Sequence, residues 1–429
     1  MDVKKVNPGR RAAFSSLCKM KAGKYTNLEV NTVLQRAEMS EADRGLYTAL
    51  VYGVTERLIT LDYIIDSLSG RSVHTLDEEV LCALRLGIYQ LTFMDRIPPH
   101  AAVSESVSLA PAKGRGFVNG VLRTFVRGGC AVPMPERTDK NYLSVQYSVP
   151  IPLCSAFVEW FGADTAEQIF ASFLKPEGTA LRVNTLRYTA KEVAERLHGT
   201  VSALCGGCVK TASFAGVLEG VEAGDWFVQD EASALCAHIL GARPGERVAD
   251  VCAAPGGKSF GIAMDMENTG TLYAFDLHAN KLSLIQRGAE KLGISILQTE
   301  ERDARDPLAD LIGKADRVLC DAPCSGLGVI GKKPDIKYKD MDTLARLPQV
   351  QFEVLVGASA YVRSGGILVY STCTLNPAEN AGVTDRFLAA HPEFEPAPFS
   401  FGGTEQSSVM LLPHIHGTDG FYICKMRRK

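Results

Sequence analysis

Two short stretches of the chain place thiols beside a carboxyl or hydroxyl group, directly after apolar runs. Asp321-Ala-Pro-Cys324 follows the run Arg317–Cys320, and Ser371-Thr-Cys373 follows the run Gly366–Tyr370. If these runs form neighbouring strands of one sheet, they lie about 4.8 Å apart. Both thiols could then face one bound planar ring.

A third stretch, Cys252–Lys258, has the sequence CAAPGGK. With Ser259 it ends like a phosphate-binding P-loop, but that motif needs glycine at the position of Cys252. Pro255 also removes a backbone N–H from the middle of the loop. The stretch is therefore not predicted to hold a nucleoside triphosphate, and its two glycines instead let the backbone approach another ligand closely.

Carboxylates accompany the next two apolar runs. Asp276 lies at the end of Thr271–Leu277, and Asp303 follows Ile294–Leu297. An acid at such a position accepts hydrogen bonds from ribose hydroxyls. In this order the glycine loop and the two acids favour a site for a dinucleotide or for S-adenosylmethionine (SAM), and the GxGxxG pattern of nicotinamide enzymes is absent.

Two thiols and an aspartate beside a methyl donor suggest one reaction in particular. Carbon-5 of cytosine is a poor nucleophile, but a thiolate added to carbon-6, with an acid at the ring nitrogen, converts it into an enamine that can attack a methyl group. A base must then remove the carbon-5 proton so that the thiolate can leave. The sequence supplies Cys373, Asp321 and Cys324 for this scheme, and Lys258 for contact with cofactor or substrate.

The elements that must position these residues are predicted from about residue 236 onward. Short apolar runs alternate there with helical stretches, which indicates a doubly wound α/β (Rossmann-like) domain over residues 236–429. Ligands of such sheets bind where loops leave the carboxyl ends of the strands. The segment Gly420–Met426 predicts one further strand.

The first 130 residues predict an all-α domain, because apolar side chains recur at three- and four-residue steps in Leu46–Leu61 and Leu81–Leu91. Loops are expected at Arg96–His100 and Lys113–Gly116, which contain proline, glycine and cations.

Residues 131–235 predict linker helices and a small α/β domain, with a strand near Ala180–Val183 and a helix near Ala190–Leu197. The whole chain is thus expected to be multidomain, with divisions near residues 130 and 235.

The composition is that of a soluble globular protein, 46% apolar and 22% charged. The charged amino end has no apolar signal core and no run approaches a membrane span, so a cytoplasmic protein without membrane contact is expected. Its 12 cysteines are then expected to be reduced thiols.

A net charge of −3 gives no global sign of a nucleic-acid partner. One local group of cations stands near the amino end, where charge alone favours a solvated helix face over a phosphate-binding surface. It consists of Lys4, Lys5, Arg10, Arg11, Lys19, Lys21 and Lys24.

At the residues with chemical potential the chain resembles the RNA cytosine-5 methyltransferases of the RsmB/NSUN type. The similar blocks are Cys252–Lys258, Asp276, Asp303, Asp321–Gly326, Lys333–Lys337 and Tyr370–Asn380. The resemblance implies that Cys373 is the nucleophile and that Cys324 serves product release. It also implies SAM as the cofactor.

The helical first domain extends the resemblance, since Tyr89–Leu91, Arg96–Ala101 and Val118–Arg123 are similar to the NusB-like RNA-binding domain of the RsmB type. This implies small-subunit (16S) ribosomal RNA as the partner, and no obligate protein partner is evident. The predicted catalytic residues are Cys373, Cys324, Asp321 and Lys258. The predicted cofactor contacts are Cys252, Ala253, Ala254, Pro255, Gly256, Gly257, Lys258, Asp276, Asp303 and Asp321.

Three alternatives remain open from the sequence. A DNA cytosine-5 methyltransferase is disfavoured by Cys373 and by the helical domain, whereas transfer RNA stays open as a substrate. An inactive RNA-binding or antitermination factor would be favoured by loss of Cys373 or of the glycine loop, and neither is lost. No metal site is expected, because neither the pair Cys205 and Cys208 nor the pair His414 and His416 has a second pair beside it.

Overall fold

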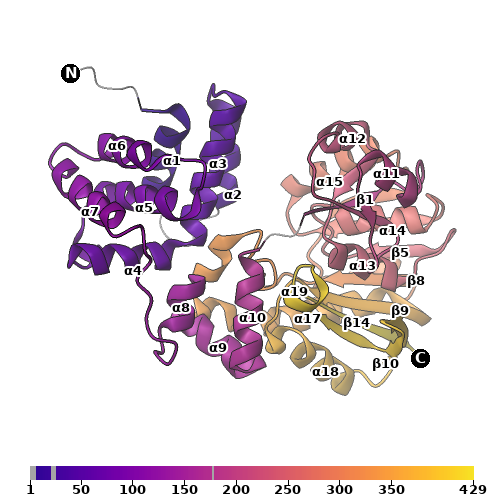
Figure 1. Cartoon of the computed structure of the whole chain (residues 1–429). Coiled ribbons are helices and arrows are strands. Elements are labelled where there is room, and N and C mark those ends of the chain that lie inside the picture. Colours follow the sequence, from indigo (N-terminus) through magenta and orange to yellow (C-terminus); the bar gives the residue numbers. More distant parts are fainter. Residues whose placement is uncertain (1–5, 21–25, 176–177) are drawn as a thin grey trace. The chain divides into compact units, whose positions relative to one another are not determined.

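The computed structural model describes residues 6–20, 26–175 and 178–429 and divides the chain into two units. The helical unit comprises residues 1–174 and 332–341, and the sheet unit comprises residues 175–331 and 342–429 (Figure 1). No helix of the described ranges is both long and apolar enough to cross a lipid bilayer. The sequence-based divisions near residues 130 and 235 stay predictions.

The helical unit confirms the all-α prediction for the first domain (Figure 1). Leu50, Leu61, Leu84 and Ile88 of the predicted apolar stripes are fully buried in one core. The predicted loops are shorter than expected, because a helix begins at Pro99 and another at Arg115. The helices are α1 (Pro8–Lys19), α2 (Thr26–Arg36), α3 (Glu41–Glu56), α4 (Leu58–Ser69), α5 (Glu78–Phe93), α6 (Pro99–Leu109), α7 (Arg115–Arg127), α8 (Tyr142–Tyr147), α9 (Ile151–Phe161) and α10 (Ala163–Phe173).

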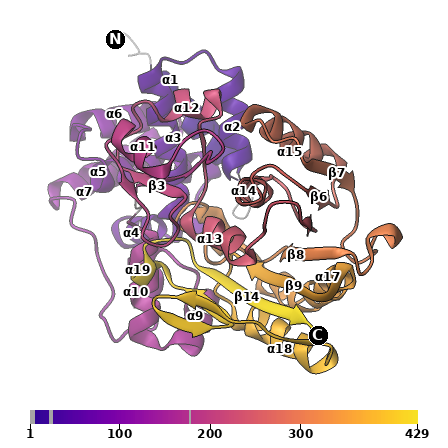
Figure 2. The ribbon, with the colours of Figure 1, turned by 90° about the vertical axis from the view of Figure 1, so that its right-hand side faces the viewer.

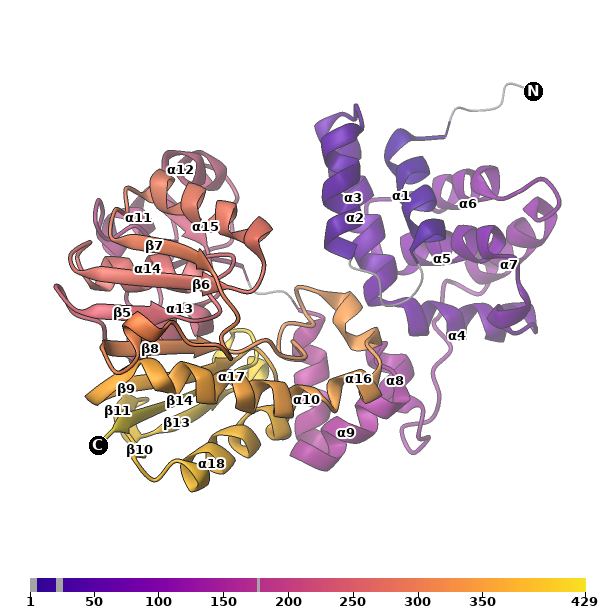
Figure 3. The ribbon, with the colours of Figure 1, turned by 180° about the vertical axis from the view of Figure 1, so that it is seen from behind.

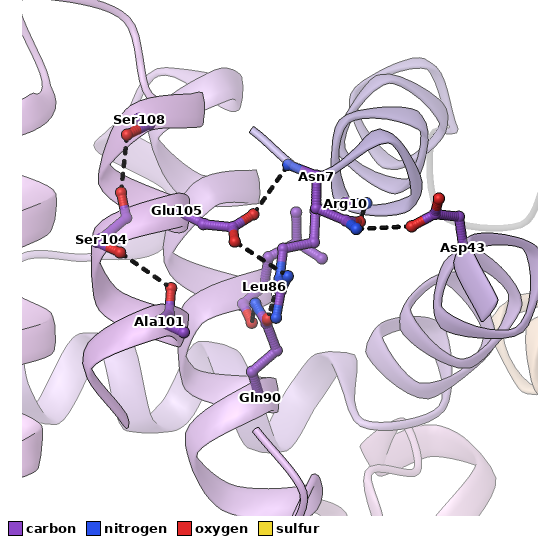
Figure 4. Close-up of polar contacts among 9 residues, drawn as sticks. All are labelled: Asn7, Arg10, Asp43, Leu86, Gln90, Ala101, Ser104, Glu105 and Ser108. Carbon is purple, nitrogen blue, oxygen red and sulfur yellow. Dashed lines mark hydrogen bonds and ion pairs between the residues drawn. The ribbon is translucent and has the colours of Figure 1, made fainter. Parts of the chain in front are cut away.

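A polar cluster fastens α1 to its neighbours, and it involves a cation of the basic amino end (Figure 4). Arg10 Nε donates to Gln90 Oε1 at 2.6 Å, and its Nη1 lies 3.2 Å from Glu105 Oε1. Asn7 Nδ2 donates to Asp43 Oδ1 at 2.6 Å. Arg10 is buried, so the prediction of a solvated face is wrong for this residue. Its contacts with Gln90 and Glu105 replace the water that its guanidinium loses on burial. Lys4, Lys5, Lys21 and Lys24 lie outside the described residues.

The segment 332–341, far along the chain, belongs to the helical unit. It contains the 3₁₀ turn η3 (Pro334–Tyr338), whose Lys337 is buried and donates from Nζ to the Glu56 carbonyl at 2.5 Å. Tyr338 donates to the Thr55 carbonyl at 3.1 Å. Part of the block Lys333–Lys337 thus has a structural role at the end of α3.

The sheet unit begins with a four-stranded antiparallel sheet in the order β2-β3-β1-β4, which confirms the predicted small α/β unit. Buried Asn184 follows its strand β1 and donates to the carbonyls of Gly224 and Leu292 at 2.8 and 3.0 Å. It thereby holds the small sheet to the larger one. The elements are β1 (Thr179–Val183), α11 (Ala190–Arg196), β2 (Thr200–Val201), β3 (Cys208–Thr211), α12 (Val217–Ala223) and β4 (Trp226–Val228).

The larger sheet has the order β10-β14-β9-β8-β5-β6-β7, with β13 beside β14 (Figure 3). Neighbours from β9 to β7 run parallel, and β14 runs antiparallel beside β9 (Figure 2). Its strands are β5 (Arg247–Asp250), β6 (Thr271–Asp276), β7 (Leu297–Glu301), β8 (Ala315–Asp321), β9 (Val362–Thr372), β10 (Phe394–Pro396), β13 (Ser408–Leu411) and β14 (Phe421–Arg428). Two further strands, β11 (Phe399–Phe401) and β12 (Thr404–Gln406), pair with each other in a separate two-stranded sheet. This Rossmann-like arrangement and the extra strand near Gly420–Met426 are as predicted.

Helices cover both faces of this sheet because successive strand residues point to opposite sides. Val248 joins the core under α13, α14 and α15, whereas its neighbour Ala249 joins the core under α17 and α18. The helices are α13 (Glu231–Leu240), α14 (Gly257–Asp265), α15 (Ala279–Leu292), α16 (Met341–Leu344), α17 (Leu347–Tyr361), α18 (Ala381–Ala390) and α19 (Pro413–His416).

One strand was misplaced by the sequence pattern. The run Ile294–Leu297 predicts a strand, but β7 begins only at Leu297. Ile294 is buried against the core before the strand starts, whereas β7 is an edge strand with exposed polar residues. The apolar pattern therefore marked the buried segment that precedes β7 and not the strand itself.

Candidate active site

The glycine loop lies at the carboxyl end of β5 and leads into α14. Gly256 has φ +110°, and a Cβ there would lie 2.4 Å from the Phe260 ring, so only glycine fits without strain. The Ala253 N–H donates to the Phe275 carbonyl at 2.8 Å, and the Ala254 N–H donates to Asp276 Oδ2 at 3.2 Å. The loop is thus held against the end of β6.

The two thiols lie side by side, as the neighbouring-strand hypothesis predicts. β8 pairs with β9, with Asp321 opposite Ser371, and the Sγ atoms of Cys324 and Cys373 lie 3.3 Å apart. The hydrogen bond with Cys373, together with burial, raises the pKa of the Cys324 thiol well above its ordinary value. The assignment of Cys373 as the nucleophile stays a prediction.

A partly buried ion pair lies next to the thiols. Lys258 Nζ lies 2.7 Å from Asp321 Oδ2, and Ser371 Oγ donates to Asp321 Oδ1 at 2.7 Å. Burial opposes the charge on Lys258, but the Asp321 carboxylate reverses this effect, so the pKa of the ammonium is raised. Lys258 Nζ also lies 5.1 Å from the centroid of the Phe421 ring. The ammonium is therefore fixed and charged at the base of the site.

These groups surround a cavity of about 260 Å³. Of the predicted site residues, Lys258, Asp321, Cys373 and most of the glycine loop line it, and Cys324 reaches it through Cys373. Several lining residues were not predicted from the sequence. Among them are Gln229, Asp230, Ser233, Asp250, Asp419 and Phe421.

Asp276 and Asp303 are not among the residues that line this cavity. Asp276 accepts hydrogen bonds from the Ala254 and His278 N–H groups and so shapes the glycine loop. Asp303 forms an ion pair with Arg305 at 2.6 Å, and this hydrogen bonding lowers the pKa of the Asp303 carboxyl. Their direct contact with a cofactor stays a prediction.

The polar atoms of the cavity fit a ligand with cationic groups and hydrogen-bond donors. Carboxylates of Asp230, Asp250, Asp321 and Asp419 border it, against the single ammonium of Lys258. Two buried acceptors, Asp250 Oδ1 and Gln229 Oε1, have no hydrogen-bond partner among the residues that the structure describes. Because buried polar atoms are normally paired, these acceptors point to a ligand that completes them. SAM has such groups, an ammonium, a sulfonium and ribose hydroxyls.

The carboxyl group of Asp250 makes the stability of the folded protein depend on pH. It is buried, it accepts from Ser259 Oγ at 2.6 Å, and burial raises the pKa of its carboxyl from 3.8 to about 7. The protonated carboxyl of Asp250 therefore favours the folded state. Its contribution to the free energy of unfolding is complete below the pKa of Asp250 in the unfolded chain and is lost as the pH rises through its pKa in the folded protein. Between about pH 5 and pH 8, the unfolding free energy should fall by roughly 2 kcal/mol more in the parent protein than in Asp250→Asn.

This difference can be measured by urea denaturation at several pH values. The chain has two tryptophans, and a Trp160→Phe background leaves Trp226 fluorescence to follow the sheet unit alone. Parallel pH profiles for the parent and Asp250→Asn would contradict the raised pKa of Asp250.

The sheet with its glycine loop, flanking carboxylates and cation-accepting cavity defines the class of the protein, a SAM-dependent methyltransferase. Comparison with known proteins agrees and is more specific. The model of the family described as 16S rRNA methyltransferase RsmB/F matches residues 237–427, and the model of the NusB family matches residues 7–127.

The chain belongs to the RsmB/F family of 16S rRNA methyltransferases. It is 37% identical to the probable ribosomal RNA small subunit methyltransferase B of Bacillus subtilis, with 98% of each chain covered. It is 35% identical to the protein of the same name from Synechocystis, with 94% of this chain and 95% of the relative covered.

Among solved structures, the crystal structure of PH0851 is similar over the full length of both chains, with a TM-score of 0.79 and 26% identity. NSun6 from Pyrococcus horikoshii shares the fold at a TM-score of 0.58 and 21% identity, over 65% of this chain and 98% of that chain. The predicted family, fold class and cofactor SAM are thereby confirmed.

Proposed function

We propose that the protein transfers a methyl group from SAM to carbon-5 of one cytosine in small-subunit (16S) ribosomal RNA, through a covalent bond between Cys373 and the base. The observation that carries this proposal is the contact of 3.3 Å between the Cys324 and Cys373 thiols at the rim of the cavity, beside Lys258 and Asp321. Ribosomal RNA as substrate is supported by the names of the bacterial relatives.

Each residue of the site has one task in the proposed reaction. The Cys373 thiolate adds to carbon-6 while the ring nitrogen takes up a proton from solvent, and the Asp321 carboxylate accepts a hydrogen bond from the resulting N–H. Carbon-5 thereby becomes an enamine nucleophile. SAM supplies the methyl group that carbon-5 accepts. Cys324, once it has lost its own proton to solvent, takes the carbon-5 proton as a thiolate. The bond between Cys373 and carbon-6 then breaks with its electron pair going to sulfur, the ring nitrogen gives up its proton, and the double bond between carbon-5 and carbon-6 returns. Lys258 holds Asp321 in place throughout.

The cofactor residues follow from the same geometry. The glycine loop and the orphan acceptors Asp250 and Gln229 would hold the cationic and hydroxyl groups of SAM. The target base must leave its stack to reach Cys373, so the modified cytosine is expected in a loop or single-stranded region. We expect a reaction on ribosomal RNA to take place in the cytoplasm.

RNA bisulfite sequencing tests this function. Total RNA from cells with and without the protein should differ at one cytosine of the small-subunit ribosomal RNA, which is protected only when the protein is present. Protection of a transfer-RNA cytosine instead would show that transfer RNA is the substrate. No change in any RNA would favour an inactive RNA-binding factor.

The helical unit offers a surface for RNA backbone. A groove of about 1030 Å³ lies between α6 and α7, with an apolar floor that includes Val103, Val107 and Val126. Its lining includes three exposed arginines and no carboxylate. They are Arg115, Arg123 and Arg127. In the described part of the chain none of these arginines forms an ion pair, so their charge is available to phosphates.

Replacing Arg123 and Arg127 together by glutamine should weaken binding of the RNA by about tenfold at moderate salt. The slope of log affinity against log salt should fall by roughly 1.4, because two phosphate contacts are lost on single-stranded RNA. Filter binding over a salt series measures both quantities, and methyl transfer at saturating RNA should be unchanged.

The matched control is Arg36→Gln with Arg44→Gln, which removes the same charge from exposed positions on α2 and α3. An equal loss of affinity in the control pair would show that net charge, and not the groove, determines RNA binding.

A further inference from the structure

A buried carboxylate outside the cavity lies behind the two thiol loops. Glu379 ends the 3₁₀ turn η4 (Pro377–Glu379), which follows the Cys373 loop, and it has no exposed surface. Neither the sequence motifs nor the proposed reaction gives this carboxylate a task.

Three donors converge on the Glu379 carboxylate from three parts of the sheet unit. The Ser325 N–H donates to Oε2 at 2.8 Å, Gln351 Nε2 donates to Oε2 at 2.8 Å, and Asn376 Nδ2 donates to Oε1 at 3.0 Å. The backbone carbonyl of Glu379 accepts from the Tyr370 hydroxyl at 2.7 Å. Within the described ranges no cation pairs with Glu379, so neutral donors alone offset the cost of burying its charge.

Two of the three donors belong to the segments that carry the thiols. Ser325 directly follows Cys324, and Asn376 lies on the loop that follows Cys373. Gln351, on α17, also donates to the Pro323 carbonyl at 2.9 Å. A second link, between the Ser325 and Thr374 hydroxyls at 2.6 Å, joins the same two loops. The carboxylate therefore fixes both loops to each other and to α17.

Glu379 also acts through its charge. After the hydrogen bond with Cys373, burial and the charge of Cys373, the negative charges of Glu379 and then Asp321 are smaller causes of the raised pKa of Cys324. A thiol with a raised pKa gives a more basic thiolate, which suits a group that must accept a proton from carbon.

We propose that Glu379 is a positioning residue that holds the Cys324 loop against the Cys373 loop for the release step. This inference rests on the proposed cytosine-5 chemistry. In that step Cys324 has lost its own proton to solvent, and the carbon-5 proton moves to its thiolate Sγ. The electron pair of the carbon–hydrogen bond forms the double bond between carbon-5 and carbon-6, and the bond from carbon-6 to Cys373 breaks with its electron pair going to the Cys373 sulfur. Glu379 touches neither the base nor the cofactor.

The variant Glu379→Gln keeps the shape but removes the charge and turns an amide group toward the donors. Release of the methylated RNA should slow by about 10- to 100-fold, so that covalent protein–RNA adduct accumulates. The kcat should fall in proportion while the KM for RNA stays within about twofold. The pH at which release is half-maximal should decrease, because loss of the charge lowers the pKa of Cys324.

Quenched-flow kinetics with denaturing gels gives the release rate, with calorimetric SAM affinity as a check on folding. Glu353→Gln, on α17 and 43% exposed at its side chain, is the matched control for loss of a carboxylate and should release RNA at the parent rate. Gln351→Met removes one donor but keeps the Glu379 charge, so it should slow release without moving the pH profile. It also supplies the test if Glu379→Gln does not fold.

Two failures can be told apart. If the parent protein forms no adduct and methylates no cytosine, the proposed function fails. If the parent forms adduct but Glu379→Gln and Gln351→Met both release RNA at the parent rate, the role of Glu379 is refuted while the function stands. A slowed release with an unshifted pH profile in Glu379→Gln would refute its effect on the basicity of Cys324.

Discussion

Replacing Cys373 by alanine should reduce methyl transfer to RNA by at least about 10⁴-fold, because carbon-5 is not nucleophilic without a thiolate at carbon-6. Binding of SAM should be nearly unchanged, since the glycine loop and Asp250 do not depend on this thiol for their hydrogen bonds. Incorporation of labelled methyl groups and calorimetric titration with SAM measure the two quantities.

A control for thiol loss in general is Cys130→Ala, which lies in the helical unit and should keep full activity. Substantial methylation by Cys373→Ala would contradict the assignment of the nucleophile. If Cys324→Ala were then the inactive variant, the two thiols would have exchanged roles.

Replacing Cys324 by alanine should trap the enzyme on its RNA. Alanine cannot accept the carbon-5 proton, so Cys373 cannot leave the methylated base, and adduct should approach one RNA per protein after a single turnover. The 3.3 Å separation of the thiols places Cys324 next to the carbon–sulfur bond that must break. Denaturing gels and intact mass spectrometry detect the adduct and the methyl group in it.

The adduct of Cys324→Ala should disappear when Cys373→Ala is added. Rapid turnover by Cys324→Ala, with no adduct, would show that another base removes the proton. Adduct in the double variant would show that a different nucleophile attacks the RNA.

Local patterns predicted the reactive groups because the chemistry of a parallel sheet gathers at one edge. Apolar runs located β8 and β9, and their neighbouring positions placed Cys324 and Cys373 together. The glycine loop was likewise found from residue types, because Gly256 has a conformation that other residues rarely adopt.

The rest of the cavity depended on contacts that no local pattern reveals. Asp419 and Phe421 enter the site because β14 pairs antiparallel with β9, and the Asp419 N–H reaches Asp230 at 3.3 Å. The extra strand was predicted, but its partner in the sheet was not. The burial of Arg10 could not be predicted from the sequence either. The charge pattern suggested a solvated side chain, and only its tertiary partners Gln90 and Glu105 explain its buried position.

Release of tritium from carbon-5 tests the central claim most directly. Small-subunit ribosomal RNA labelled with [5-³H]cytosine is incubated with the protein and unlabelled SAM, and tritium in water is compared with methyl groups counted in a parallel reaction. The proposed reaction predicts one tritium released for each methyl group transferred, with neither event in Cys373→Ala. Methyl transfer without tritium release would show that the methyl group goes to another atom and would contradict the cytosine-5 mechanism.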